Sequence, residues 1–306
     1  MKITLPDNSS RELPEGSSGY DLAKDIGPGL AKSAVAVSVD GVQRDLHDVI
    51  EGDASVSIIT IDSDEGIEIM RHTLTAQVLA RAIKNLYPKS KLAIGPTIDD
   101  GFYYDVESEK SISSDDLSKI EDEMKKIIKT KSSITKKLVS KSEALKVFKE
   151  KKESYKEIIV NESKQKDNFQ LYYQDDKKFV DLCRGPHLPN LEFIGSFKLT
   201  KVSGAYWKGD SANAMLTRIY GTAFNNEKDL QSHLDNLEEA LKRDHRKLGK
   251  EMDLFHFQDE APGMVFWHQN GWSIYRKLRN FIRGRLKEND YIEVLSLIHI
   301  SEPTRP

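Results

Sequence analysis

The sequence predicts an α+β chain of several domains, and three observations indicate this. Short segments alternate apolar and polar residues between turn residues, as at Ile3 to Leu5 and Ala34 to Val39, which is typical of strands. Longer segments repeat apolar residues at helical spacing, as from Met70 to Leu86. A chain of 306 residues is also long enough for two or three domains with their own cores.

Residues 1–62 predict a small mixed domain. Ser18 is placed to cap a short helix, which the run Gly27-Pro28-Gly29 ends. Asp40-Gly41 is a strong two-residue hairpin signal between two strands, and Val56 to Ile61 predicts a further strand. Strands around one helix indicate a β-grasp, ubiquitin-like domain, a fold that carries no catalytic signal by itself.

Residues 63–225 predict a second α+β domain. Pro88 ends the helix expected from Met70 to Leu86, and Gly101 to Asp105 reads as an aromatic strand. Ser113 and an aspartate three residues later resemble a capping box, which opens an amphipathic helix. Another helix is expected from Ser142 to Lys149, and strand-like segments follow.

Residues 226–250 predict a linker helix. Asn226 can cap it, and its leucines share one face: Leu230, Leu234, Leu237 and Leu241. The basic cluster Lys242 to Lys247 either complements the helix dipole or contacts nucleic acid, and the sequence does not separate these two roles. Residues 251–294 begin a further segment, with an amphipathic helix from about Ser273 to Glu288.

The composition indicates a soluble, cytoplasmic protein. Charged residues make up 31% of the chain but the net charge is only −3, so any contact with nucleic acid depends on local patches. No apolar run approaches the roughly 20 residues of a membrane helix. The N-terminus lacks the apolar stretch of a secretory signal, and the chain has a single cysteine.

That cysteine, Cys183, lies in the run Asp181-Leu182-Cys183-Arg184-Gly185-Pro186-His187. A lone cysteine makes no internal disulfide, so Cys183 is a packed thiol, a nucleophile, a metal ligand or a polar contact in a site. Taken alone, the run favours a buried thiol beside a solvent-exposed histidine. The wider sequence raises the weight of a functional site.

Six motifs in order resemble threonyl-tRNA synthetases of the bacterial type, from Met1 to about Val294. They are Ile94-Gly95-Pro96 with Gly101-Phe102-Tyr103-Tyr104-Asp105, the run from Asp181 to His187, Gly204-Ala205-Tyr206-Trp207-Lys208-Gly209-Asp210, Arg218-Ile219-Tyr220-Gly221-Thr222-Ala223, Arg243-Asp244-His245-Arg246-Lys247, and Gly263-Met264-Val265-Phe266-Trp267-His268.

The resemblance implies a β-grasp (TGS-like) domain at 1–62, an editing domain at 63–225, a linker helix at 226–250 and the start of a class II catalytic domain at 251–294. The family attaches threonine to its tRNA with ATP, and it implies a homodimer. Residues 295–306 depart from the family and are expected to be a non-native tail. ATP, magnesium and zinc are implied for a catalytic core beyond this point, and no cofactor is expected with certainty in the present chain.

The resemblance also implies hydrolysis of mischarged Ser-tRNA(Thr). Serine lacks one methyl group of threonine, a difference worth only about 1–3 kcal/mol to a binding pocket. A second site that hydrolyses the seryl ester supplies the missing fidelity. The residues that match the family's site are expected to be catalytic: His72, Lys156, Asp181, Cys183 and His187. Gly95 and Tyr104 are expected as pocket walls that contact the substrate or tRNA.

The sequence departs from the family at the helix that carries His72. The family shows a His-x-x-x-His pair there, but the residue four after His72 is Ala76, and a register from the far end of the helix gives Thr73 and Gln77. Gln77 is the nearest polar substitute and is expected to contact substrate. Because structural zinc normally has four nitrogen or sulfur ligands, no metal is expected.

Two other functions are compatible with the sequence. One is a freestanding deacylase that edits in trans, against which the segment 251–294 argues. The other is a non-catalytic RNA-binding module built on the β-grasp domain, which binds tRNA without hydrolysing it. A deacylation assay separates this last function from an editing enzyme.

Overall fold

A computed structural model describes residues 1–174 and 179–294. The predicted non-native tail at 295–306 lies outside the described residues. The chain divides into two compact units, Met1–Gln231 and Ser232–Pro306. None of the helices in the described ranges is both long and apolar enough to cross a membrane.

Within the unit Met1–Gln231, the predicted first domain at 1–62 is built on one sheet with the strand order β2-β1-β5-β3-β4. Its strands are β1 (Lys2–Thr4), β2 (Ser10–Glu12), β3 (Ala34–Val39), β4 (Val42–Asp45) and β5 (Ala54–Thr60), and its helices are α1 (Gly19–Ile26) and α2 (Pro28–Ser33). Strand β1 runs parallel to β5, whereas the other pairs are antiparallel. Apolar side chains such as Ile3, Leu22 and Val56 form the core between the sheet and α1. The arrangement is the mixed sheet with a covering helix that the sequence predicts.

Local signals predicted the turns of this domain correctly. The Ser18 hydroxyl accepts a hydrogen bond from the Asp21 N–H, and the Asp21 carboxylate accepts one from the Ser18 N–H, which together make a capping box for α1. Asp40 and Gly41 both have positive φ, at 50° and 80°, in the tight turn between β3 and β4. Positive φ at both central residues is the requirement that favours Asp-Gly in such hairpins.

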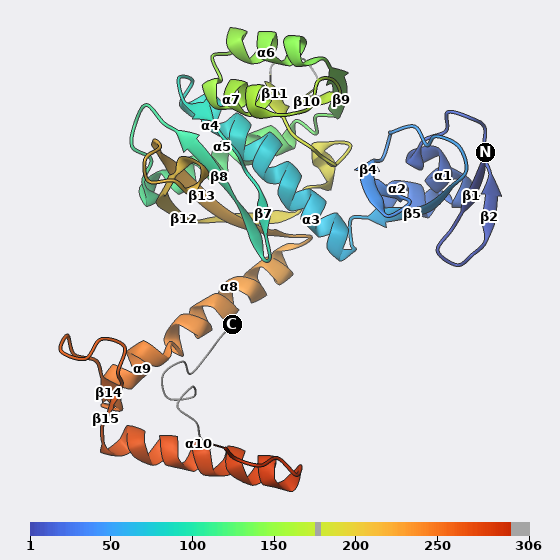
Figure 1. The fold of residues 1–306 in the computed structure, drawn as a ribbon. Coiled ribbons are helices and arrows are strands. Elements are labelled where there is room, and N and C mark those ends of the chain that lie inside the picture. The colour runs from blue at the N-terminus through green and yellow to red at the C-terminus, as the bar shows by residue number, and fades with distance from the viewer. Residues whose placement is uncertain (175–178, 295–306) are drawn as a thin grey trace. The chain divides into compact units, whose positions relative to one another are not determined.

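The predicted second domain, at 63–225, is centred on another five-stranded sheet with the order β12-β13-β8-β6, in which β7 also pairs with β8. These strands are β6 (Lys91–Leu92), β7 (Thr97–Ile98), β8 (Gly101–Glu107), β12 (Ser196–Tyr206) and β13 (Met215–Phe224). One long helix packs on this sheet, formed by α3 (Asp64–Thr73), a π-helical stretch (Leu74–Leu79) and α4 (Ala80–Leu86) (Figure 1). Helix α5 (Leu117–Lys129) packs beside α4 and against β12.

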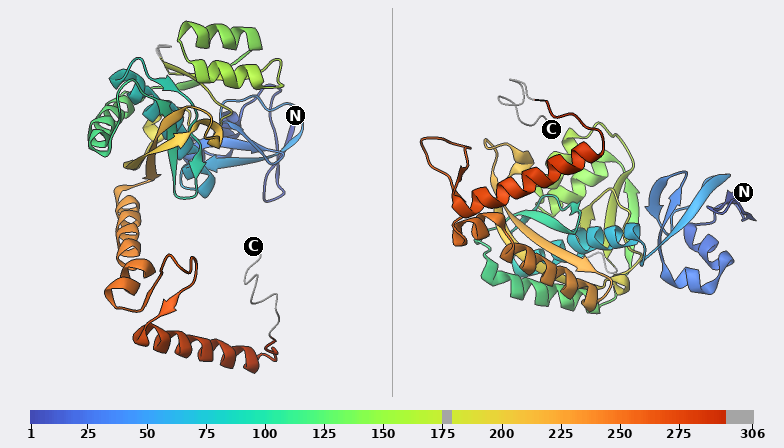
Figure 2. Two further views of the ribbon diagram at one scale, coloured as in Figure 1. Left: turned by 60° about the vertical axis from the view of Figure 1, so that its left-hand side comes forward. Right: turned by 90° about the horizontal axis from the view of Figure 1, so that it is seen from below.

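A smaller sheet of three strands, ordered β11-β10-β9, completes the second domain. Its strands are β9 (Ile134–Val139), β10 (Phe169–Gln174) and β11 (Phe179–Leu182). Helices α6 (Lys141–Glu150) and α7 (Ser154–Glu162) lie side by side over it (Figure 2). Phe148, Val160 and Leu171 are among the buried residues that join helices and sheet. The helix predicted from Ser142 to Lys149 is therefore present and slightly longer.

Helix α8 (Glu227–Lys242) follows the second domain, and the Asn226 side chain accepts a hydrogen bond from the Asp229 N–H at its start, as the sequence predicts. The second unit then contains α9 (His245–Glu251), the short hairpin strands β14 (Phe255–His256) and β15 (Phe266–Trp267), and α10 (Gln269–Glu288). The last of these is the amphipathic helix expected near its C-terminus, and it begins four residues earlier than predicted.

Candidate active site

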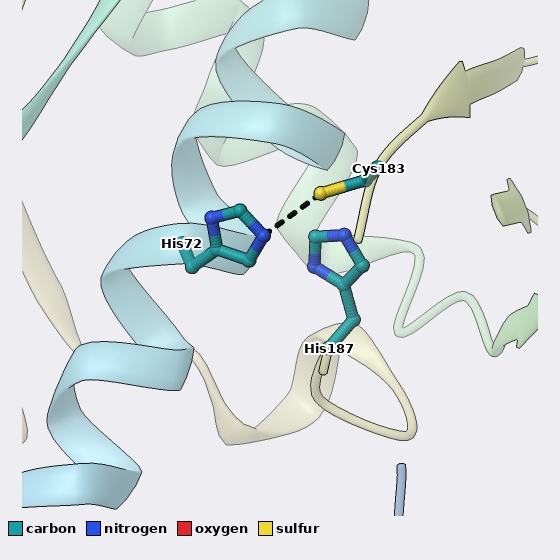
Figure 3. A group of neighbouring side chains, drawn as sticks. All are labelled: His72, Cys183 and His187. Carbon is teal, nitrogen blue, oxygen red and sulfur yellow. Dashed lines mark hydrogen bonds between the residues drawn. The ribbon is translucent and has the colours of Figure 1, made fainter. Parts of the chain in front are cut away.

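Three side chains that the sequence singles out meet at one point of the second domain. His72 comes from the last turn of α3, Cys183 follows strand β11, and His187 lies in the loop beyond it (Figure 3). The His72 Nε2 and Cys183 Sγ atoms are 2.8 Å apart, and the two imidazole rings stack with centroids 4.6 Å apart and planes within 6°. The packing thus brings His72 into contact with Cys183, which is 111 positions away in the sequence.

His187 is held by several contacts. Its Nδ1 lies 3.1 Å from the Thr73 hydroxyl, which also accepts a hydrogen bond from the Leu188 N–H. Its ring and the Tyr172 ring form a T-shaped pair, with centroids 4.4 Å apart. His187 is 2% exposed, and its Nε2 has no hydrogen-bond partner within the described part of the chain. A buried polar atom without a partner is costly, so this nitrogen is a natural contact for a water molecule or a substrate group.

A second, charged group lies beside the histidines. Lys156 Nζ, from α7, is 2.6 Å from Asp181 Oδ1, from β11, and the two side chains are only 4% and 2% exposed. The Tyr104 hydroxyl of β8 donates to the other Asp181 oxygen at 3.4 Å, and the Leu182 N–H donates to Oδ1. Asp181 is therefore compensated by three donors.

Burial sets the protonation of two of these groups. It lowers the pKa of His72 below the usual value near 6.5, although the negative charge of Asp181 opposes the change. Burial also raises the pKa of Asp181, and the adjacent Lys156 ammonium acts in the opposite direction. At neutral pH the His72 imidazole is neutral, and a neutral imidazole can accept a proton from water.

A cavity of about 800 Å³ opens beside this group. It is lined by most of the residues that the sequence predicts for the site: His72, Gly95, Tyr104, Lys156, Asp181 and Cys183. Gly95 has a clear steric reason, because a Cβ atom there would lie 2.2 Å from the Tyr104 ring. The expectation that Gly95 and Tyr104 form the pocket wall fits this geometry.

Gln77 does not join the group, contrary to the sequence-based expectation. Its side chain is fully buried in the π-helical stretch, and its backbone and side-chain oxygens lie within hydrogen-bond distance of Gln174 Nε2. Ala76, and not Gln77, is among the described residues that line the cavity. The residue four positions after His72 therefore faces the cavity and offers it only a methyl group.

Three contributors were missed by sequence reasoning. Thr73 and Tyr172 fix the His187 ring, and Asp45 of the first domain accepts hydrogen bonds from both the Tyr172 hydroxyl and the His187 N–H. Thr73 entered the sequence analysis only as an alternative register for the histidine pair. No local motif marks Tyr172 or Asp45, since their roles depend on contacts between distant segments.

His72, Cys183 and His187 also form a group of side chains that could hold a metal ion. One ligand atom each from His72, Cys183 and His187 lies within 4.8 Å of the others, and the sequence had predicted no metal here. Three nitrogen and sulfur donors with an open fourth position are the pattern of catalytic zinc sites, whereas structural zinc takes four. The donor types fit zinc, and the alanine at position 76 removes a fourth possible ligand.

Comparison with known proteins defines the class of the chain. A family profile described as "TGS domain" matches residues 1–60, and one described as "Threonyl and Alanyl tRNA synthetase second additional domain" matches residues 170–220. The second match contains the cysteine run, strand β12 and the first part of strand β13. These stretches of the chain are thus similar to a TGS domain and to an accessory domain of threonyl- and alanyl-tRNA synthetases.

One relative is similar to the chain over most of its length. The chain is 50% identical over 292 residues, 95% of its length, to a threonine–tRNA ligase of Hahella chejuensis (strain KCTC 2396). The match covers 45% of that ligase, so the chain spans less than half the length of this relative. The resemblance to threonyl-tRNA synthetases is confirmed.

Proposed function

We propose that the second domain hydrolyses Ser-tRNA(Thr), which makes it the editing site of a threonine–tRNA ligase. The observation that carries this proposal is the convergence of His72, Cys183 and His187 beside a cavity of about 800 Å³. The buried Lys156–Asp181 pair lies on the wall of the same cavity.

In the proposed reaction, His72 acts as the general base. Its neutral imidazole takes a proton from a water molecule, and the water oxygen bonds to the seryl carbonyl carbon. The bond from that carbon to the ribose oxygen of the terminal adenosine then breaks, and this oxygen takes up the proton from His72. The products are serine and uncharged tRNA, and no redox change occurs.

The other residues bind and orient. His187 is not among the described residues that line this cavity, but its ring stacks on that of His72, and Cys183 holds the His72 ring in place through its sulfur. Lys156 supplies positive charge at the cavity wall, and Asp181 fixes its position. Three exposed cations also line the cavity, Lys164, Arg184 and Lys208, and they suit the phosphates of a tRNA end.

The activity of the whole protein is part of the same proposal. A match of 292 residues leaves few of the 306 unmatched, so it includes most of the segment 251–294. This supports 251–294 as the beginning of a class II catalytic domain, after the predicted divisions at 1–62, 63–225 and 226–250. The ligase would attach threonine to tRNA(Thr) with ATP and magnesium, in the cytoplasm and as a homodimer. The same match argues against a freestanding deacylase.

The test is a deacylation assay with Ser-tRNA(Thr) and Thr-tRNA(Thr). We expect the chain to release serine faster than the uncatalysed reaction, and His72→Ala to remove at least 100-fold of the rate. A chain that binds tRNA and releases no serine would instead support a non-catalytic RNA-binding module. Asp62→Asn serves as a matched control, because Asp62 is not among the described residues that line the cavity.

A further inference from the structure

One carboxylate of the first domain reaches the site of the second. Asp45, the last residue of β4, accepts a hydrogen bond from the His187 N–H at 2.8 Å through Oδ1. Its Oδ2 accepts one from the Tyr172 hydroxyl at 2.9 Å and lies 2.9 Å from Lys136 Nζ. His187 is 142 residues away from Asp45 in the sequence. A single side chain thus joins the backbone of one site residue to the hydroxyl of another.

Asp45 bonds directly to the backbone of His187, and through Tyr172 it also affects the His187 ring. Tyr172 is 1% exposed, and its ring forms a T-shaped pair with the His187 imidazole at a centroid distance of 4.4 Å and an angle of 80°. Burial, followed by the nearby Asp45 charge, raises the pKa of Tyr172, so the phenol stays protonated and donates to Asp45. Asp45 is thus the nearer of two acceptors that hold the Tyr172 hydroxyl, the other being Gln170 Oε1 at 3.1 Å.

The loop before His187 is shaped to admit this hydroxyl. Gly185 has φ +68°, and a Cβ atom there would lie 2.0 Å from the Tyr172 oxygen. Thr73 holds the His187 ring through Nδ1. Asp45 and Thr73 therefore determine between them where the unpartnered Nε2 of His187 lies.

We propose that Asp45 is a positioning residue of the hydrolytic site, through which the first domain fixes the backbone and the ring of His187. The inference rests on the proposed function and deepens it. Neither Asp45 nor His187 is among the described residues that line the main cavity, and both line a smaller cavity of about 300 Å³ together with Tyr172. The proposed effect of Asp45 therefore passes through His187, whose ring stacks on that of His72. The first domain then contributes to hydrolysis even though its fold carries no catalytic group.

The experiment compares Asp45→Ala with Asp48→Ala in the full chain. Both carboxylates pair with Lys136, but in the described part of the chain it is Asp45, and not Asp48, that accepts hydrogen bonds from His187 and Tyr172. We expect Asp45→Ala to lower the single-turnover rate of Ser-tRNA(Thr) hydrolysis about tenfold or more, because small misplacements of a reacting group are costly. Asp48→Ala should change it less than twofold.

Tyr172→Phe separates the two links, since it keeps the ring and removes only the hydroxyl. We expect a loss between those of the two carboxylate variants. It also serves if Asp45→Ala does not fold, together with Asp45→Asn, which keeps an acceptor for the His187 N–H and should lose less than Asp45→Ala. A change in the pH–rate profile is expected for Asp45→Ala, whereas a smaller folded fraction would leave the profile's shape unaltered.

Imidazole ¹⁵N NMR of His187, assigned with a His187→Gln variant, gives a readout independent of hydrolysis. We expect the His187 ring nitrogens to shift in Asp45→Ala and to stay in place in Asp48→Ala. Equal rates and equal His187 spectra in the two alanine variants would overturn the positioning role. If the His187 ring nitrogens shift in Asp45→Ala but the wild-type chain hydrolyses no ester, the proposed function is overturned, while the positioning of His187 by Asp45 stands.

Discussion

The buried pair Lys156–Asp181 allows a stability prediction that can be worked from the structure. Lys156→Met removes the cation 2.6 Å from a carboxylate that is 2% exposed and leaves Asp181 with only the Tyr104 hydroxyl and the Leu182 N–H. Removing one partner of a buried ion pair typically costs about 3–5 kcal/mol. We expect a loss of that size in the free energy of unfolding of the second domain at pH 7.

The loss should depend on pH in a defined direction. Without Lys156, burial raises the folded-state pKa of Asp181 further above that of the unfolded chain. The folded variant then binds a proton more readily than the unfolded chain, so its stability falls as the pH rises through this range and recovers at acid pH. The difference between wild type and Lys156→Met should therefore shrink as the pH is lowered.

Tryptophan fluorescence during urea denaturation measures the free energy of unfolding of the second domain. The chain has three tryptophans, and Trp207 is the one in the second domain, where it is 7% exposed and its ring meets that of Tyr155. In a background of Trp267→Phe and Trp272→Phe, the signal reports on Trp207 alone. Lys156→Met combined with Asp181→Asn should recover most of the loss, because no buried charge remains. A Lys156→Met protein as stable as wild type at pH 7 would refute the reasoning.

Further predictions concern the histidine group. Because burial lowers the pKa of His72, hydrolysis should already be at its plateau at pH 7 and fall only below the usual histidine range, and His72→Ala should lose this dependence. The stability that neutral His72 provides is complete above about pH 6.5 and is lost as the pH falls through its folded-state pKa, with a slope of at most about 1.4 kcal/mol per pH unit. Ala76→His adds a fourth donor facing the cavity, so calorimetric titration should show tighter zinc binding than wild type; equal affinity would count against the placement of residue 76. Gly185→Ala should destabilise the second domain by more than about 1 kcal/mol in the same fluorescence assay, because its φ is positive and its Cβ would meet Tyr172; an unchanged midpoint would contradict this.

Local signals carried much of the fold. The Ser18 cap, the Asp40-Gly41 hairpin and the Asn226 cap each depend on residues within three positions, and each is present in the structure. The division of one predicted helix by a π-helical stretch at Leu74–Leu79 has no such local signal. That stretch contains Gln77, which is buried against Gln174 and not in the cavity as the sequence-based expectation had it.

The sequence predicted which residues belong to the site better than it predicted which of them are in contact. Family motifs point to His72 and Cys183, but their contact spans 111 residues and follows only from the packing of α3 against the loop after β11. The role of Asp45 could not be predicted from the sequence for the same reason, since its partner His187 is 142 residues away, in another domain. Tertiary contacts of this kind leave no periodicity or spacing for a sequence to show.

The most direct test of the account is the rate at which the purified chain releases serine from Ser-tRNA(Thr) under single-turnover conditions. The account predicts hydrolysis that is faster for the seryl than for the threonyl ester and that falls at least 100-fold in His72→Ala. Release of serine at the same rate with and without the His72 imidazole would contradict it.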